Sequence, residues 1–433
     1  MSGTPLHLLG ACAAQAALAQ RSLRAEDLVR ACLEHIAARE PQVQAWQTLA
    51  ADAAIARARA LDAAAWQGAL HGLPIGVKDL IDTFDLPTGY GSPIYASHRP
   101  QADASCVASL RAAGGIVLGK TVSTEFATFT ANQTRHPLRP THTPGGSSSG
   151  SAAAVADHMV PLALGTQTAG SLIRPASFCG IVAFKPTFGH IWRAGVKPLS
   201  DSLDTVGSLA RDVPDAALLA AALAGRDEWR VQDLGQATGG LLRVGICRTH
   251  EWSQADADTV ATLEGACAAL ARRSQVRLRE VELPDAWRSL VAAQTTIQLY
   301  EQAQSLRHEH LMLRGRLSAR LQGILDQGAS VSVAQYDAAQ QHAAQCRAQL
   351  AQVFDGVDVL LTPSAIGAAP QGLDATGDPL FCRIWTLLHT PALNIPVGSA
   401  CDGLPVGLQV IALPGRDAMA LTAAHALHQW LSR

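Results

Sequence analysis

The chain has 433 residues, of which 48% are hydrophobic and 16% are charged. That much apolar material can build a large core, which excludes an intrinsically disordered protein. Lysine and arginine number 34 and aspartate and glutamate 36, a net charge of −2, so no basic excess points to nucleic acid as a partner.

The cysteines and the N-terminus bear on the cellular compartment. Nine cysteines are scattered along the chain without a CxxC pair, which is typical of free thiols in a reducing environment. The short apolar stretch near the N-terminus follows no basic segment, so we predict no signal peptide. No apolar run reaches the length of about 18 residues that a membrane span needs. We therefore expect a cytoplasmic protein that has no membrane partner.

The first part of the chain predicts helices, two strands and one long loop. Apolar residues recur every three to four positions from residue 20 onward, so 20–62 is expected to be helical. Short apolar runs at 74–77 and 116–122 predict strands, and 102–115 predicts a helix that ends at two glycines. Residues 131–151 are rich in Pro, Gly, Ser and Thr, and so long an irregular loop between apolar flanks is usually functional.

Helices and strands alternate through the rest of the chain. Residues 241–249 and 276–283 predict strands on either side of a helix at 256–273, a βαβ unit that implies parallel pairing. Residues 286–355 are expected to be mostly helical, and two strands are expected within 392–412 around Asp402-Gly403. No linker or repeat divides the chain, so we predict one large α/β domain with a mixed sheet.

Three glycine-rich segments carry the chemistry. Lys78 lies in GLPIGVKDLIDT, and the other two segments are TPGGSSSGSAAAVA at 143–156 and GTQTAGSLIRPASFCG at 165–180. Glycine lets the backbone approach a ligand closely and present its N–H groups to it. Serines in such loops are candidate nucleophiles.

These three segments together resemble the amidase signature family, and the likeness covers nearly the whole chain, including 202–219 and 377–398. The resemblance implies a Ser–cis-Ser–Lys triad in which Ser171 is the nucleophile, Ser147 the serine across a cis peptide bond and Lys78 the base. It also implies an oxyanion hole formed by the backbone N–H groups of Thr168, Ala169, Gly170 and Ser171. The implied fold is a single amidase domain over 1–433, a large mixed sheet flanked by helices on both faces, with N-terminal helices at about 1–65 packed onto the core.

The residue chemistry agrees with that assignment. A serine hydroxyl needs a base, and lysine can act as one only when burial or nearby cations lower its pKa from about 10.4. Lys78 follows the apolar run LPIGV, where burial is expected. A second serine placed between the lysine and the nucleophilic serine can relay the proton, because a hydroxyl both donates and accepts.

Several residues depart from the common family motif GTDTGGS. Gln167 stands in place of its acid and Ala169 in place of a glycine, and Ser149 replaces a usual glycine in the preceding loop. Arg174 follows Ser171 by three residues rather than two, as in malonamidase-like relatives whose arginine binds a substrate carboxylate. We therefore expect Arg174 to bind substrate and to favour a small anionic amide, with a structural ion pair as the alternative.

Other catalytic arrangements compete with this one. Residues 146–150 also match GxSxG, which would make Ser148 the nucleophile of an α/β-hydrolase with a histidine such as His389 or His428. That arrangement needs a strand before the serine, and TRHPLRPTHTP does not predict one. No HExxH occurs, and the histidines at 308 and 310 are spaced to face apart on a helix, so we expect no metal.

The function we expect is an amidohydrolase that cleaves the C–N bond of a small carboxamide, including one that carries a carboxylate or ureido group, through a serine acyl-enzyme and without a cofactor. One alternative is a glutaminase-type subunit of an amidotransferase assembly, active only with partner chains. A second is an esterase with an α/β-hydrolase-like nucleophile. The resemblance also favours a homodimer.

Overall fold

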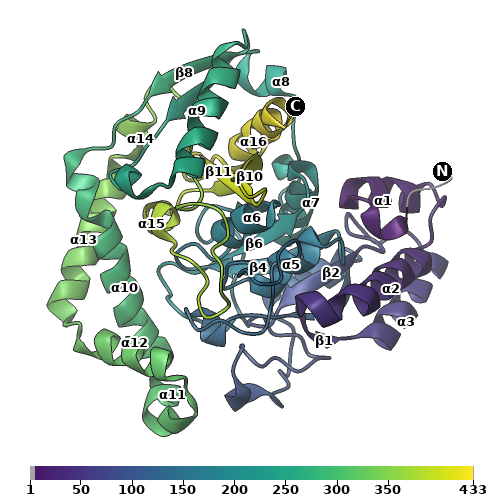
Figure 1. The fold of residues 1–433 in the computed structure, drawn as a ribbon. Helices are drawn as coiled ribbons and strands as arrows, with labels where there is room; N and C mark the ends of the chain where they lie inside the picture. The colour runs from purple at the N-terminus through teal and green to yellow at the C-terminus, as the bar shows by residue number, and fades with distance from the viewer. Residues whose placement is uncertain (1–4, 433) are drawn as a thin grey trace.

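A single eleven-stranded mixed sheet runs through the computed structural model, which describes residues 5–432 (Figure 1). Its strand order is β1-β3-β2-β4-β6-β5-β10-β11-β9-β7-β8. The strands are β1 Trp46–Leu49, β2 Pro74–Lys78, β3 Ile116–Thr121, β4 Leu162–Gln167, β5 Val182–Lys185, β6 Thr205–Ala210, β7 Leu242–Ile246, β8 Val276–Glu280, β9 Val359–Pro363, β10 Ala392–Ser399 and β11 Pro405–Ile411.

The pairing within the sheet is parallel in two regions and antiparallel between them. Strand β2 pairs in parallel with both β3 and β4, and β7 pairs in parallel with β8 and β9. The strands from β4 to β9 along the sheet order are antiparallel, including the β10–β11 hairpin. The predicted βαβ unit, the predicted hairpin and the mixed sheet are therefore confirmed.

Helices pack around this sheet and along one side of it. They are α1 Ala11–Ala19, α2 Ala25–Val43, α3 Ala51–Ala63, α4 Ser105–Ala112, α5 Ser149–Ala156, α6 Ile173–Cys179, α7 Val213–Ala224, α8 Leu234–Thr238, α9 Ala257–Ala271, α10 Leu290–Ser305, α11 Arg307–Met312, α12 Ala319–Ser330, α13 Val333–Ala348, α14 Leu350–Val353, α15 Leu380–Leu387 and α16 Asp417–Leu431.

Strand β4 shows how helices cover both faces of the sheet. Side chains alternate between the faces of a strand. A Cβ at Gly165 would meet Leu172, just before α6, so this position faces the α5–α6 side. The neighbouring residue Leu164 pairs with Ser208, whose hydroxyl donates to the Ala216 carbonyl of α7. Helices α6 and α7 therefore lie on opposite faces, as the family resemblance implied.

The prediction of continuous helix over 20–62 is wrong in its middle. Helix α2 ends at Val43 because Gln44 adopts a left-handed conformation with φ of 54°. The chain then forms β1, in which Trp46 pairs with Thr121 of β3 at the edge of the sheet. Helix resumes only at Ala51.

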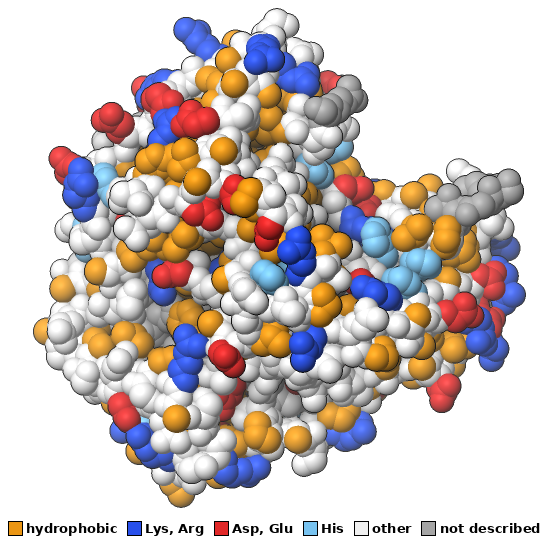
Figure 2. Space-filling model, in the orientation of Figure 1, with side chains coloured by type: hydrophobic (Ala, Val, Ile, Leu, Met, Phe, Trp, Pro, Cys, Tyr) orange, Lys and Arg blue, Asp and Glu red, His pale blue; other side chains and the backbone are white. Residues whose placement is uncertain are grey.

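Residues 290–353, which we call the helical arm, confirm the predicted helical region (Figure 1, green). Helix α10 packs against α11, α12 and α13, and also against α15 beside the sheet. Charged side chains of both signs are interspersed with apolar ones on the face shown in Figure 2.

Within residues 5–432, no helix is long and apolar enough to span a membrane.

Candidate active site

Lys78 is the last residue of β2 and is completely buried. Its Nζ lies 2.7 Å from the Oγ of Ser147 and 2.8 Å from the Oγ1 of Thr166. All three glycine-rich segments therefore meet at one amine, which comes from the interior of the sheet.

Burial changes the proton affinity of this amine. Loss of solvation lowers the pKa of Lys78 from 10.5 to about 7, and the negative charge of Asp204 opposes part of that effect. A substantial fraction of Lys78 is therefore neutral near pH 7. The fall in pKa that the sequence chemistry required is present.

The loop that carries Ser147 is held in place by its neighbours. The peptide bond between Gly146 and Ser147 is cis. Arg174 donates from Nη2 to the Gly146 carbonyl at 2.6 Å, and the Ser147 carbonyl accepts from the Thr124 N–H at 3.3 Å. A Cβ at Gly146 would lie 2.7 Å from Cγ2 of Thr376, so a larger residue would displace the loop.

Ser171 lies in the turn between β4 and α6. Gln167, the residue that replaces the family acid, accepts the N–H groups of Leu172 and Ile173 on its Oε1 at 2.9 and 3.1 Å. It thereby satisfies the first free N–H groups of α6. Its Nε2 donates to Thr386. Gln167 thus orients the turn.

The backbone amides of this turn are free to bind a ligand. Across residues 5–432, the N–H groups of Ala169, Gly170 and Ser171 meet no hydrogen-bond acceptor. A Cβ at Gly170 would lie 2.8 Å from the Cβ of Pro379, which leaves room only for glycine. Three adjacent backbone donors in this turn are therefore unpaired among the described residues.

The serines differ in access and in bonding. Ser171 is 8% exposed, whereas Ser148 is fully buried. The Ser148 hydroxyl is bound to strand β4 through the Thr166 carbonyl at 3.2 Å and the Thr166 N–H at 3.3 Å. His389 contacts the Ser202 carbonyl instead of a serine hydroxyl. The geometry therefore gives no support to Ser148 as an α/β-hydrolase nucleophile. The Ser149 hydroxyl donates to the Val122 carbonyl.

Arg174 is 2% exposed and only partly paired. Besides the Gly146 carbonyl, its Nη2 donates to Oγ1 of Thr376 at 3.1 Å. Its Nε and Nη1 have no partner in the part of the chain that the structure describes. Burial lowers the pKa of Arg174 to about 10, which still leaves it charged at neutral pH. It supports the Ser147 loop and retains two free donors.

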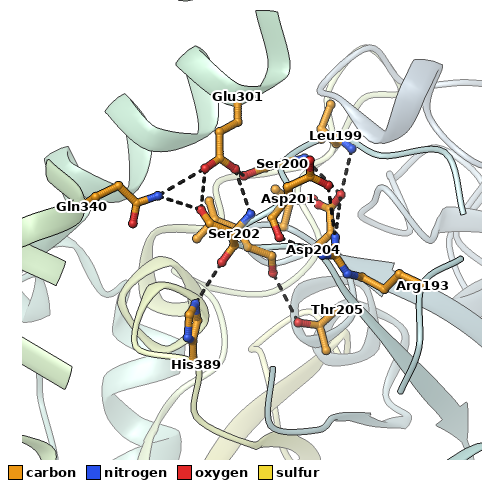
Figure 3. Close-up of polar contacts among 12 residues, drawn as sticks. Arg193, Leu199, Ser200, Asp201, Ser202, Asp204, Thr205, Glu301, Gln340 and His389 are labelled. Atoms are coloured by element: carbon orange, nitrogen blue, oxygen red, sulfur yellow. Dashed lines mark hydrogen bonds and ion pairs between the residues drawn. The ribbon is translucent and has the colours of Figure 1, made fainter. Parts of the chain in front are cut away.

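Sequence reasoning missed Asp204, which supports the turn that carries Ser171. Thr168 donates its hydroxyl to Oδ1 of Asp204 at 2.6 Å. Asp204 also accepts the N–H groups of Leu199 and Ser200 (Figure 3). Asp204 lies in the SLDTVG segment that contributes to the family resemblance, but nothing in that segment alone indicates its contact with Thr168.

Glu301 of α10 connects the helical arm to the same segment. It accepts the hydroxyls of Ser200 at 2.6 Å and Ser202 at 2.7 Å (Figure 3). Tyr336 and Gln340 of α13 also donate to Glu301. No local sequence pattern marks the contacts of Glu301 with Ser200 and Ser202, because they join residues 101 and 99 positions apart.

Residues 27–421 match the model of the family described as Amidase. The chain belongs to this family and is an enzyme that hydrolyses amide C–N bonds.

Known relatives cover nearly its full length. A glutamyl-tRNA(Gln) amidotransferase subunit from Anaeromyxobacter dehalogenans (strain 2CP-C) is 36% identical, over 98% of this chain and 96% of its own. The native peptide amidase from Stenotrophomonas maltophilia shares 29% identity and a TM-score of 0.84, over 99% and 98% of the two chains. An inhibitor-bound chain of a vestigial protein complex, which bears on the origins of an s-triazine catabolic enzyme, shares 28% identity and a TM-score of 0.88, over 97% and 98%.

Proposed function

We propose that this amidase hydrolyses a small carboxamide with Ser171 as nucleophile and Lys78, acting through Ser147, as base. The observation that carries the proposal is the contact of 2.7 Å between Lys78 Nζ and Ser147 Oγ at a buried amine whose pKa is about 7. A neutral amine has a lone pair for the Ser147 proton, and Ser147 can then accept the proton of Ser171.

In the proposed reaction, one proton moves from Ser171 to the base and then to the leaving nitrogen. The Oγ of Ser171 bonds to the carbonyl carbon as its proton passes through Ser147 to Lys78. The C–N bond breaks when the leaving nitrogen takes this proton back, and ammonia or an amine departs. Water then attacks the acyl ester with the same base, which releases the acid and restores Ser171.

The backbone amides at 168–171 would stabilise the oxyanion that forms. The free N–H groups of Ala169, Gly170 and Ser171 support this role. Backbone donors fixed in advance need no reorganisation during the reaction, and one such donor typically contributes about 10²–10³ in rate.

The substrate is proposed to carry a carboxylate or ureido group next to the scissile amide. Arg174 supports this choice, because its Nε and Nη1 are buried donors without partners among residues 5–432 and its charge is retained. The two donors lie on either side of Nη2, so each can donate one hydrogen bond to a carboxylate oxygen or a urea carbonyl, and the guanidinium supplies the positive charge.

A second candidate function is the glutaminase-type subunit of an amidotransferase assembly. It is favoured by the full-length relatives that are named as subunits of glutamyl-tRNA(Gln) amidotransferase. Ammonia release by the purified chain alone would support the independent amidase. Release that requires added partner subunits would support the assembly, and faster turnover of esters than of matched amides would support an esterase.

The proposed function is tested by covalent labelling and by a substrate screen. Mass spectrometry after treatment with a fluorophosphonate should locate the label on Ser171. A panel of malonamate, biuret-type and aryl amides, assayed for ammonia or amine release, should reveal turnover that the Ser171→Ala variant lacks. Label on Ser148, or full turnover by Ser171→Ala, would overturn the assignment.

A further inference from the structure

A cavity of about 310 Å³ lies between the helical arm and α15. Its walls include Gln298 and Gln302 of α10, Arg320 of α12 and Arg383 of α15, with Phe129 at one side. None of the residues that line the cavity is acidic. The cavity therefore combines amide side chains and cationic side chains in one space.

Hydrogen bonds made by Gln294 link a wall of this cavity to the turn that holds Ser171. Arg383 donates from Nη1 to Oε1 of Gln294. The Nε2 of Gln294 in turn lies 3.2 Å from the Thr168 carbonyl and 3.0 Å from Oε1 of Gln298. One side chain, Gln294, thus separates the cavity wall from the 168–171 turn. A substrate held at that turn would reach the cavity by displacing the buried Gln294 side chain.

Gln302 indicates what part of a ligand the cavity fits. Its side chain is fully buried, yet neither its Oε1 nor its Nε2 has a hydrogen-bond partner among residues 5–432. A buried amide that is left unpaired is costly, and such a group in a folded protein calls for an explanation. A ligand that supplies one N–H and one carbonyl, as a peptide or ureido group does, would satisfy both atoms once a neighbouring side chain moves aside, because neither atom is exposed in this structure.

The two arginines indicate the charge of the ligand. Arg320 is exposed at the arm, lies 5.8 Å from the Phe129 ring centroid, and donates to the Asp374 carbonyl at 3.3 Å. Arg383 is half-buried and uses Nη1 for Gln294. Both guanidinium groups keep donors that can pair with a carboxylate.

We propose that this cavity binds the distal end of the substrate's acyl portion, with a linker amide or ureido group on Gln302 and a carboxylate on Arg320 and Arg383. The inference rests on the proposed function and applies to its primary-amide substrates, because a primary amide loses only ammonia and any extension then belongs to the acyl side. It goes beyond that function in naming an extended acidic amide with an internal CO–NH group.

Binding to the Ser171→Ala protein tests the proposal without turnover. The probe is N-succinylglycinamide, which has a terminal carboxamide, an internal amide and a distal carboxylate. Calorimetry should show that it binds roughly tenfold more tightly than the neutral succinamide-ended analogue. Arg320→Gln should remove most of that preference, and added salt should weaken it, because Arg320 is exposed.

A matched variant controls for the loss of charge. Arg307→Gln removes an exposed arginine of the same arm that contacts Gln304. It should keep the preference for the acidic probe. Equal affinity for the two probes in the parent protein, no binding of either, or equal losses in both arginine variants would overturn the proposal.

Gln302→Met separates ligand binding from a structural role. The substitution removes an unpaired buried amide, so the melting temperature should stay the same or rise, while affinity for N-succinylglycinamide falls about fivefold or more. The ester-linked analogue, which lacks the internal N–H and bonds to Gln302 only through its carbonyl, should lose less than the amide in this variant. A lower melting temperature with equal affinity losses for all probes would show that Gln302 serves the fold. Labelling of Ser171 is scored separately, so failure here leaves the proposed chemistry standing.

Discussion

Thr168 and Asp204 are joined by a hydrogen bond of 2.6 Å, and the same carboxylate opposes the effect of burial on the pKa of Lys78. One residue thus acts on both the turn that carries Ser171 and the protonation of the proposed base. Asp204→Asn removes the charge; its amide oxygen can keep the N–H groups of Leu199 and Ser200, while its NH2 group can donate to the threonine hydroxyl.

Asp204→Asn should shift the acidic limb of the pH profile of kcat/KM to lower pH. Without the carboxylate, the charged form of Lys78 loses a stabilising neighbour, so its pKa falls further. Thr168→Val breaks the hydrogen bond without changing the charge. It should leave the limb in place and lower kcat by roughly tenfold, less than the 10²–10³ expected for a lost oxyanion donor. Identical profiles for both variants would contradict this division of roles.

Loss of either proposed catalytic residue, Ser171 or Lys78, should abolish turnover without unfolding the protein. Ser171→Ala truncates a hydroxyl in a turn, so the melting temperature should change little, whereas kcat should fall by several orders of magnitude. Lys78→Met should have a similar effect, because one base serves both acylation and deacylation. Steady-state kinetics together with thermal unfolding check both outcomes.

Ser148→Ala provides the comparison. It should retain the chemistry but destabilise the protein, since that hydroxyl is bound to β4.

The activity should rise with pH through about 7. Only the neutral amine of Lys78 accepts a proton, and its pKa is lowered to about 7, so kcat/KM should be low at pH 5 and reach a plateau above about 8. The measurement is a pH–rate profile over a stable range. Maximal activity near pH 5 would indicate a carboxylate base instead.

Lys185 offers a control for the assignment of Lys78 as the base. It is also fully buried, and burial lowers its pKa to about 7, but its amine donates to the carbonyls of Pro186 and Thr390. Lys185→Met should retain turnover per folded molecule.

Lys185→Met should also change how stability depends on pH. Between pH 7 and 10 the unfolded lysine binds a proton that the folded one does not, so the free energy of unfolding rises with pH. Removing Lys185 should reduce that slope by up to about 1.4 kcal/mol per pH unit. Denaturant titrations at several pH values measure this slope, and an unchanged slope would count against a neutral buried Lys185.

Arg174→Ala should discriminate between substrate binding and loop support. If a substrate carboxylate binds Arg174, kcat/KM for malonamate should fall by an amount equivalent to about 2–4 kcal/mol, with a much smaller loss for a neutral amide of equal size. Arg174→Lys should restore only part of it. Equal losses on both amides together with a lower melting temperature would assign Arg174 to the Gly146 and Thr376 contacts alone.

Much of this arrangement could be predicted because the chemistry lies in local motifs. The segments around Lys78, Ser147 and Ser171 are each recognisable from a few adjacent residues, and the structure brings the first two into contact. The alternation of apolar runs also predicted the βαβ unit and the hairpin. The assignment of roles to Ser171 and Arg174 stays a prediction until the variants are made.

The parts that could not be predicted depend on contacts between distant residues. Strand β1 has only four residues and becomes a strand by pairing with β3, so no periodicity marked it. Thr166 contacts Lys78 across 88 positions, and Glu301 reaches Ser200 across 101. The first contact is set by the pairing of β2 with β4 and the second by the packing of the arm beside the sheet, and local sequence patterns contain neither.

Strand β2 is hydrogen-bonded to a neighbour on each side, and Lys78 is its final residue. The helical arm reaches the same region through side chains, chiefly those of α10. In laboratory evolution, the helical arm can therefore be mutated while β2 and Lys78 are kept unchanged. A library confined to the cavity-facing positions of α10 and α12 would sample new amide preferences on an unchanged reaction centre, whereas randomising β2 would mostly yield inactive proteins.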